Sequence, residues 1–191
     1  MESSTKKDTI TSSQIKSRER VANHGEVFTA EREVKAMCDL VKDETERIES
    51  RFLEPACGDG NFLAEILERK LAVVSKQYAK NPNDWEKHSL LALCSLYGID
   101  ILQDNAATCR KRLYEIWLCQ YEKLCANKIP SEQKEQAQKC AGFILKKNIL
   151  CGNALSLKEV DDAQNDTERP IIFCEWSVVG ENLKRRDFSF R

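Results

Sequence analysis

The chain has 191 residues, a formal net charge of −1 and 41% hydrophobic residues, so it is long and apolar enough to bury one sizeable core. Its near-neutral charge excludes the overall basic character of many nucleic-acid-binding domains, so any contact with nucleic acid is local or is supplied by another segment. No apolar run approaches the roughly 20 residues that a membrane-spanning helix needs, and we expect no membrane partner.

Helical and extended patterns alternate along the chain. Residues 1–20 are polar and rich in Ser, Thr and Lys, which predicts a flexible arm before a single domain at 21–191. Apolar spacing predicts helices at 30–48 (capped by Thr29), 61–78, 105–125 and 131–138, with another after the break at 81–84. Strands are expected at 51–55, 96–101, 148–155 and 171–176, and a solvated loop at 160–170. This order predicts a mostly parallel α/β sheet that binds its ligand at the strands' carboxyl ends.

The nine cysteines are numerous for a chain of this length. No two of them are spaced as CxxC, which argues against a zinc ribbon or a thioredoxin-like site, and no signal peptide is recognisable. Cysteine is commonly a small buried hydrophobe in reducing compartments. We therefore expect reduced thiols in a cytoplasmic protein, and no metal site.

A glycine turn follows the first expected strand in RFLEPACGDGNFLAEIL, residues 51–67. Its Gly-Asp-Gly sequence matches half of the dinucleotide fingerprint GxGxxG, whose third glycine is replaced by Leu63. Such turns usually cradle phosphate through backbone N–H groups, but Glu54 and Asp59 would repel a pyrophosphate here. An ammonium and a sulfonium group suit these carboxylates better. S-adenosylmethionine carries both, together with a ribose for an acidic residue such as Asp100.

Four segments, in order, resemble motifs of amino-type DNA methyltransferases, particularly the adenine-N6 enzymes of restriction–modification systems. FLEPACGDGNF (52–62) resembles their first motif, HGEVFTAEREV (24–34) the motif before it, YGIDI (97–101) the second and ILCGNAL (149–155) the third. The resemblance covers roughly residues 18–155. It implies a Rossmann-like S-adenosylmethionine-dependent methyltransferase sheet that is incomplete, with three strands and one further candidate.

The resemblance also implies a cofactor role for matched positions, running from the methionine to the adenine of the cofactor. The methionine end is expected to contact Val27, Phe28, Thr29, Glu54, Ala56 and Gly58, with Asp59 and Gly60 in the turn and Phe62 beneath the cofactor. Asp100 is expected to accept hydrogen bonds from the ribose hydroxyls and Ile101 to pack on the adenine face. The adenine edge is expected to meet Asn153 and Ala154.

The family's catalytic motif, Asn or Asp followed by two prolines and an aromatic, is absent from the sequence. Asn81-Pro82 is followed by Asn83 and is expected to be a turn. Glu175 and Trp176 offer an acceptor and an aromatic, but they lack the rigid double proline, so we assign no catalytic residue. The basic end KRRDFSFR leaves two interpretations open, a contact with DNA phosphate or a solvated surface.

These patterns predict the cofactor-binding part of an adenine-specific DNA methyltransferase, which transfers a methyl group from S-adenosyl-L-methionine to the N6 amine of adenine in DNA. We expect the chain to be inactive alone, because the target-base pocket and DNA recognition would lie on a missing segment or on a separate polypeptide. Two alternatives remain open. One is a methyltransferase acting on RNA or protein, and the other is a non-catalytic cofactor-binding subunit or truncated remnant.

Overall fold

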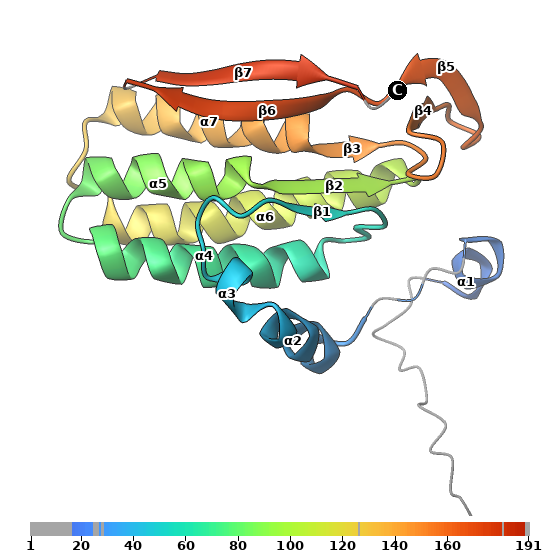
Figure 1. The fold of residues 1–191 in the computed structure, drawn as a ribbon, viewed down its shortest axis with the longest axis horizontal. Helices are drawn as coiled ribbons and strands as arrows, with labels where there is room; N and C mark the ends of the chain where they lie inside the picture. Colours follow the sequence, from blue (N-terminus) through green and yellow to red (C-terminus); the bar gives the residue numbers. More distant parts are fainter. Residues whose placement is uncertain (1–16, 25–26, 28, 126, 181, 190–191) are drawn as a thin grey trace, which may run out of the picture.

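The computed structural model describes residues 17–24, 27, 29–125, 127–180 and 182–189, which form a layered α/β fold (Figure 1). The helices are α1 (Arg18–His24), α2 (Glu31–Leu40), α3 (Lys42–Thr45), α4 (Asn61–Tyr78), α5 (Pro82–Cys94), α6 (Gln103–Leu124) and α7 (Ser131–Asn148). The strands are β1 (Phe52–Glu54), β2 (Leu96–Asp100), β3 (Ile149–Cys151), β4 (Lys158–Val160), β5 (Asp166–Pro170), β6 (Phe173–Val179) and β7 (Asn182–Phe188).

Strands β1, β2 and β3 form one parallel sheet in this order. Each crossover between them contains two long helices, α4 and α5 before β2, then α6 and α7 before β3. Figure 1 shows α5 and α7 running directly into β2 and β3, with α4 and α6 packed beside them. A three-stranded parallel sheet with helical crossovers is compatible with the expected Rossmann-like fold.

The two faces of β2 belong to two different apolar clusters, because side chains alternate along a strand. Leu96 faces the larger cluster, which the four long helices form around the fully buried Trp85 and Trp117. Tyr97 and Ile99 face the other way and pack against residues 171–173, which precede and begin β6. The Tyr97 hydroxyl donates a hydrogen bond to the carbonyl of Cys174 at 2.7 Å, which attaches the C-terminal hairpin to the sheet.

Residues 171–176, expected to be a fourth strand of the sheet, do not join it within the described chain. They contribute β6, which pairs antiparallel with β7 along its whole length. The expected loop at 160–170 is also wrong in part, since β5 pairs antiparallel with β4. Both segments form hairpins with the strand next to them along the chain, β4 with β5 and β6 with β7, and the residues of one strand alone do not specify that partner.

The expected helix at 30–48 is two helices. Helix α2 ends before Val41, whose φ and ψ of −122° and 36° lie outside the helical region, and α3 follows as a single turn. Thr29 is not the cap, because the N-cap of α2 is Ala30 and no side chain caps it. Of the apolar positions that indicated this helix, Val34, Cys38 and Ile48 are buried, whereas Met37 and Val41 are about half exposed.

Three other boundaries differ from the expectation. Helix α7 continues ten residues beyond the expected 131–138, and β3 is shorter than the expected 148–155 because it ends at Cys151. Residues 1–16 of the expected arm lie outside the described chain, whereas α1 begins at Arg18, inside that expected segment. Helices α4 and α6 agree with the expectation to within two residues at each end.

The nine cysteines are free thiols. Cys119 is exposed and Cys140 and Cys151 are half-buried, whereas the other six are buried, so most but not all follow the expected packing role. Burial raises the pKa of the Cys125 and Cys174 thiols to about 11, which keeps both in the neutral form at physiological pH.

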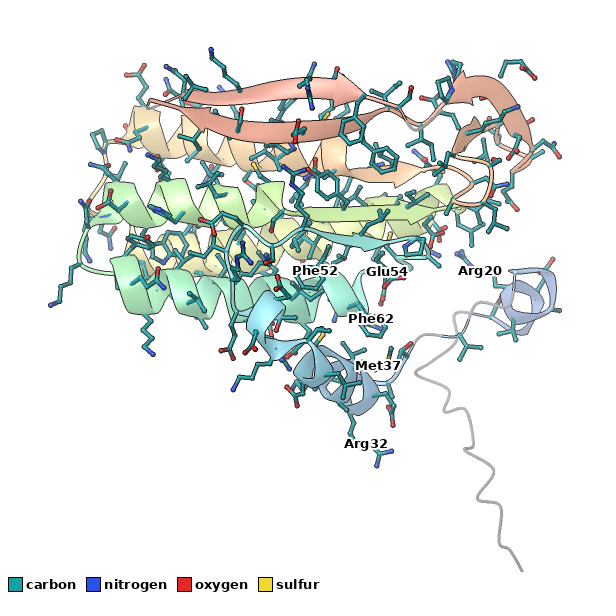
Figure 2. The ribbon with its side chains drawn as sticks, in the orientation of Figure 1. Arg20, Arg32, Met37, Phe52, Glu54 and Phe62 are labelled. Atoms are coloured by element: carbon teal, nitrogen blue, oxygen red, sulfur yellow. The ribbon has the colours of Figure 1, made fainter. Side chains whose placement is uncertain are left out.

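Strand β1 has a pairing partner on one side only among the described residues. The N–H of Phe52 donates to the carbonyl of Ser95 at 2.9 Å, toward β2, so the N–H and C=O of Leu53 point away from the sheet. Beside this edge lies an apolar groove of about 470 Å³, the edge groove (Figure 2). It is lined by Met37, Cys38, Leu40, Val41, Phe52, Leu53, Glu54, Phe62, Leu63 and Ile66.

Candidate cofactor-binding site

One buried carboxylate joins the carboxyl ends of β1 and β2. Oδ2 of Asp100, the last residue of β2, accepts a hydrogen bond from the backbone N–H of Gly58 at 2.8 Å. Its Oδ1 accepts from the N–H of Leu102 at 2.8 Å and from Nδ2 of Asn105 at 3.2 Å. Only 8% of Asp100 is exposed, so these three donors replace the water that its carboxylate loses. A carboxylate has about four acceptor positions, which leaves one for a ligand hydroxyl.

The turn after β1 requires glycine at two positions. Gly58 and Gly60 have φ values of +53° and +90°, in the left-handed region that side chains disfavour. A Cβ at Gly60 would also lie 2.7 Å from Sγ of Cys109 on α6. Gly60 is the N-cap of α4, so the free N–H groups of the first helical turn lie beside the glycine turn.

Two carboxylates of the turn lack strong partners in the described chain. Burial raises the pKa of Glu54, whose hydrogen bond from the N–H of Ala56 is long, at 3.4 Å. Oδ1 of Asp59 is buried and has no hydrogen-bond partner among the described residues, while its Oδ2 lies 3.5 Å from Nη1 of Arg112. Partly desolvated carboxylates without full compensation favour a cationic ligand over a phosphate.

Glu54 and Phe62 lie on the β1 side of the glycine turn. Both side chains line the edge groove, and Met37 of α2 lies across from them (Figure 2). Phe62 and Glu54 therefore border the same groove. Ala56 is exposed in the turn between them.

A second cavity, of about 420 Å³, lies at the carboxyl ends of β2 and β3. It is lined by Arg20, Ile101, Leu102, Gln103, Asp104, Cys151, Val160, Asp161, Asp162 and Gln164. The Arg20 guanidinium donates to both carboxylate oxygens of Asp104, at 2.7 and 3.1 Å, and to Oδ1 of Asn105 at 3.2 Å. These contacts hold α1 against the first turn of α6, so Arg20 lines the same cavity as the expected adenine contact Ile101.

Asn153 and Ala154, expected at the adenine edge, follow β3 and make contacts within the described chain. Oδ1 of Asn153 accepts from the N–H groups of Leu155 and Ser156, at 2.9 and 3.4 Å. Its Nδ2 donates to Oδ1 of Asp166 at 2.9 Å, so the side-chain amide is used within a turn. Ala154 packs against the smaller apolar cluster. Neither residue lines the cavity at β2 and β3.

The expected methionine contacts at 27–29 are only partly described. Phe28 lies outside the described residues, and Val27 is 38% exposed. The carbonyl of Thr29 accepts a hydrogen bond from Nδ2 of Asn61 at 3.3 Å, which brings this segment to the first residue of α4. Sequence reasoning missed Asn61, although it directly follows the glycine turn in the motif.

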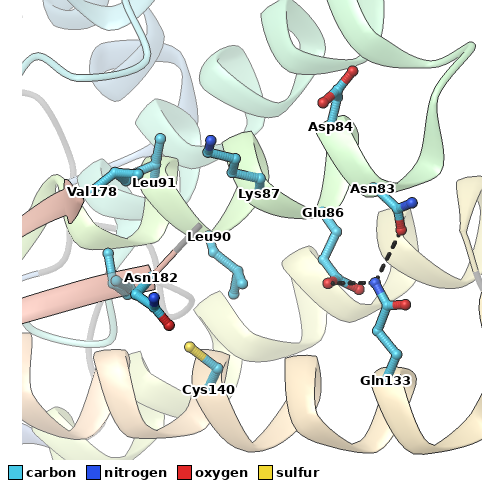
Figure 3. A pocket seen from close by; sticks show the side chains of 11 residues that line it. Asn83, Asp84, Glu86, Lys87, Leu90, Leu91, Gln133, Cys140, Val178 and Asn182 are labelled. Carbon is cyan, nitrogen blue, oxygen red and sulfur yellow. Dashed lines mark hydrogen bonds between the residues drawn. The ribbon is translucent and has the colours of Figure 1, made fainter. Parts of the chain in front are cut away.

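A third cavity, of about 480 Å³, lies between α5, α7 and the tip of the β6–β7 hairpin (Figure 3). Nε2 of Gln133 lies between Oδ1 of Asn83 and Oε1 of Glu86, at 3.0 and 3.1 Å, and donates to both (Figure 3). Because α5 leads into the amino end of β2, this cavity is at the opposite end of the sheet from the glycine turn.

Among the described residues, no group of three His, Cys, Asp or Glu side chains is placed to hold a metal ion. Within the same part of the chain, no helix is both long and apolar enough to cross a membrane.

The parallel sheet, the glycine turn and the acid at the end of β2 form an α/β domain in which the turn and the acid meet at the carboxyl ends of β1 and β2. Residues 29–180 match the family model described as MmeI, DNA-methyltransferase domain. This match spans most of the chain, and the chain therefore belongs to this family of restriction–modification DNA methyltransferase domains. The resemblance to such enzymes is thereby confirmed. No curated protein and no solved structure matches the chain.

Proposed function

We propose that this domain binds S-adenosyl-L-methionine and serves in methyl transfer to the N6 amine of adenine in DNA. The observation that carries the cofactor assignment is the hydrogen bond from Gly58 to Asp100, which joins two motif positions beside the weakly partnered carboxylates of Glu54 and Asp59. Family membership supports DNA methylation, and the FLEPACGDGNF motif supports adenine as the target.

The residues present fit this cofactor at both ends. Glu54 and Asp59 would hold its cationic amino-acid portion, because their carboxylates are partly desolvated and lack full compensation. The remaining acceptor position of Asp100 would receive a ribose hydroxyl, and Ile101 would contact the adenine in the cavity at β2 and β3. When bound, the cofactor supplies a methyl group on a positively charged sulfur.

The acceptor amine needs a clamp that the described residues do not form. Glu175 is paired with Arg51 at 3.1 Å and with Arg186 at 2.5 Å, and these arginines hold its pKa below its ordinary value. Nε1 of Trp176 donates to Oδ1 of Asn148 at 2.8 Å. Both side chains thus hold the hairpin in place. We infer that the clamp belongs to a separate segment or polypeptide that also contacts DNA.

The test is incorporation of tritiated methyl groups into unmethylated duplex DNA, with nucleoside analysis of the product. We expect no incorporation by the chain alone, because much of the rate of such a reaction comes from orienting the two reactants. N6-methyladenine is expected once a neighbouring gene product carrying an Asn-Pro-Pro-aromatic motif is added. If the chain alone incorporates methyl groups, and Glu175→Ala or Trp176→Ala abolishes this incorporation, then the β6–β7 hairpin holds the acceptor amine. Labelling of RNA or protein but not of DNA would show that the substrate of the methyl transfer is not DNA.

The open edge of β1 is the surface that best suits such a partner. Leu53, Met37 and Val41 are about half exposed there, and an unpaired strand edge with an apolar surround favours association.

We expect the isolated chain to self-associate in sedimentation velocity experiments, and Leu53→Lys to shift it toward monomer because a charged side chain opposes edge pairing. Val179→Lys, at a residue 50% exposed on the hairpin, is the matched control and should leave self-association unchanged. A wild-type chain that remains monomeric at high concentration would contradict this expectation.

Cofactor binding should depend on pH through Glu54. Burial raises the pKa of Glu54 in the free protein, and a cationic ligand favours the charged form, so the pKa falls on binding and a proton is released. Affinity for S-adenosylmethionine is therefore lowest in acid, rises with pH and levels off above the raised pKa. Calorimetry across the acidic range should show this rise, and Glu54→Gln should flatten it. Equal slopes for the two proteins would exclude Glu54 from the cofactor site.

A further inference from the structure

A single guanidinium on α6 connects three parts of the proposed cofactor site. Nη1 of Arg112 donates to Oδ1 of Asn61 at 2.5 Å and lies 3.5 Å from Oδ2 of Asp59. Nδ2 of Asn61 in turn donates to the carbonyl of Thr29 at 3.3 Å. The glycine turn, the start of α4 and the backbone that enters α2 are thus joined through one side chain.

The chemistry of arginine determines which way the amide of Asn61 points. A guanidinium has only donors, so the atom of Asn61 that faces Arg112 has to be the carbonyl oxygen. The amide NH₂ group then faces Thr29, whose backbone carbonyl can only accept. Without Arg112, Oδ1 of Asn61 loses this donor, and the 3.3 Å hydrogen bond to the Thr29 carbonyl has to hold the amide without that second contact.

The contact lies where the methionine side of the cofactor site is built. Thr29 is two residues before α2, and α2 provides the wall of the edge groove opposite Glu54 and Phe62. Oδ1 of Asp59 has no hydrogen-bond partner in the described structure, so Arg112 contacts only the other oxygen of this carboxylate.

We propose that Arg112 is a positioning residue, which fixes Asn61 and thereby holds Thr29 and the start of α2 against the glycine turn before the cofactor arrives. The identity of the ligand rests on the proposed function, whereas the link between α6 and α2 does not. The simpler alternative is a surface ion pair with Asp59, since the side chains of Arg112 and Asp59 are 40% and 28% exposed. Such exposed ion pairs contribute little to the stability of a protein.

The first measurement follows hydrogen exchange in the protein without cofactor. We expect Arg112→Met to accelerate amide exchange in α2 by about tenfold, as loosening of a local unit would. Asn61→Asp keeps an acceptor for Arg112 but removes the donor to Thr29, and it should accelerate exchange in α2 similarly. Lys111→Met is the control, because Lys111 neighbours Arg112 on α6 but is 76% exposed and 3.8 Å from Glu115. It should leave exchange in α2 unchanged.

The second measurement separates the two ends of the ligand by calorimetry. We expect Arg112→Met to lower the affinity for S-adenosylhomocysteine about tenfold and to leave the affinity for adenosine unchanged. The reason is that preorganisation of the α2 wall affects only a ligand that touches this wall. Arg112→Lys keeps the charge but has no planar fork, and an intermediate loss is expected. Unchanged exchange in α2, or equal weakening of both ligands, would overturn the proposal. If the wild type binds neither ligand, the proposed function fails and the exchange experiment alone decides the role of Arg112.

Discussion

Asp100→Ala is expected to lower the free energy of unfolding by about 3 kcal/mol and to abolish cofactor binding. The substitution leaves the N–H groups of Gly58 and Leu102 and the amide of Asn105 without their acceptor at a site that is 8% exposed. It also releases the glycine turn from the end of β2. Urea unfolding followed by circular dichroism gives the first quantity, and calorimetry with S-adenosylhomocysteine gives the second.

Asp100→Asn divides the effect between the two carboxylate oxygens. An amide can keep its oxygen toward Leu102 and Asn105, but its NH₂ group then faces the N–H of Gly58, and two donors oppose each other. For Asp100→Asn we therefore expect about half of the stability loss of Asp100→Ala, together with most of its loss of cofactor binding. Asp43→Ala, at an exposed residue in α3, is the control and should change neither quantity. Wild-type stability of Asp100→Ala would show that the carboxylate does not hold the turn.

The parts of the fold that were predictable are those determined locally. Helix α4 was expected at 61–78 and has these bounds, because a glycine turn marks its start and apolar residues recur at helical spacing along it. The buried strand β2 was equally clear, since Leu96, Tyr97 and Ile99 stand close together between two helical patterns. Local signals of this kind do not depend on which distant segment packs against them.

The parts that were missed depend on which neighbouring strand a segment pairs with. The apolar run at 171–176 does contribute to a strand, but that strand pairs with β7 instead of joining the parallel sheet, and its side chains pack against Tyr97 and Ile99. Strand β5 has the sequence Asp-Thr-Glu-Arg-Pro, which carries no apolar alternation and owes its extended form to pairing with β4. Neither choice of partner is encoded within the segment itself.

The candidate site shows the same division. The proximity of Asp100 to the glycine turn was predictable from the sequence, because the carboxyl ends of neighbouring parallel strands lie at the same edge of a sheet. Asn153 sits at a strand end too, but its amide is used in a turn with Asp166, a residue from a segment expected to be loop. The sequence did not indicate a role for Arg112, since a single arginine on a long helix is ordinarily a solvated charge. Its contact with Asn61, and through Asn61 with Thr29, becomes visible only in the structure.

Lys70→Met is the other substitution with a large expected effect, a loss of about 3 kcal/mol in the free energy of unfolding. Lys70 on α4 is fully buried, and its Nζ donates to the carbonyls of Arg47, Ile48 and Ser50, at 2.9, 2.9 and 2.6 Å. These bonds fix the segment that enters β1. Methionine keeps the length of the chain but leaves three carbonyls without a donor. Urea unfolding measures the loss, and Lys76→Met, at an exposed lysine on the same helix, should match the wild type.

The contribution of Lys70 to the free energy of unfolding is expected to depend on pH. Burial lowers the pKa of Lys70 to about 7 from its ordinary value of 10.5, although the three carbonyl acceptors oppose the shift. Above pH of about 7 the unfolded chain holds more protons on this group than the folded protein, so the contribution of Lys70 to stability rises with pH toward 10.5. The difference in unfolding free energy between wild type and Lys70→Met should therefore widen between pH of about 7 and 9. A difference that narrows over this range would mean that the carbonyls raise the pKa of Lys70 above that of the unfolded chain.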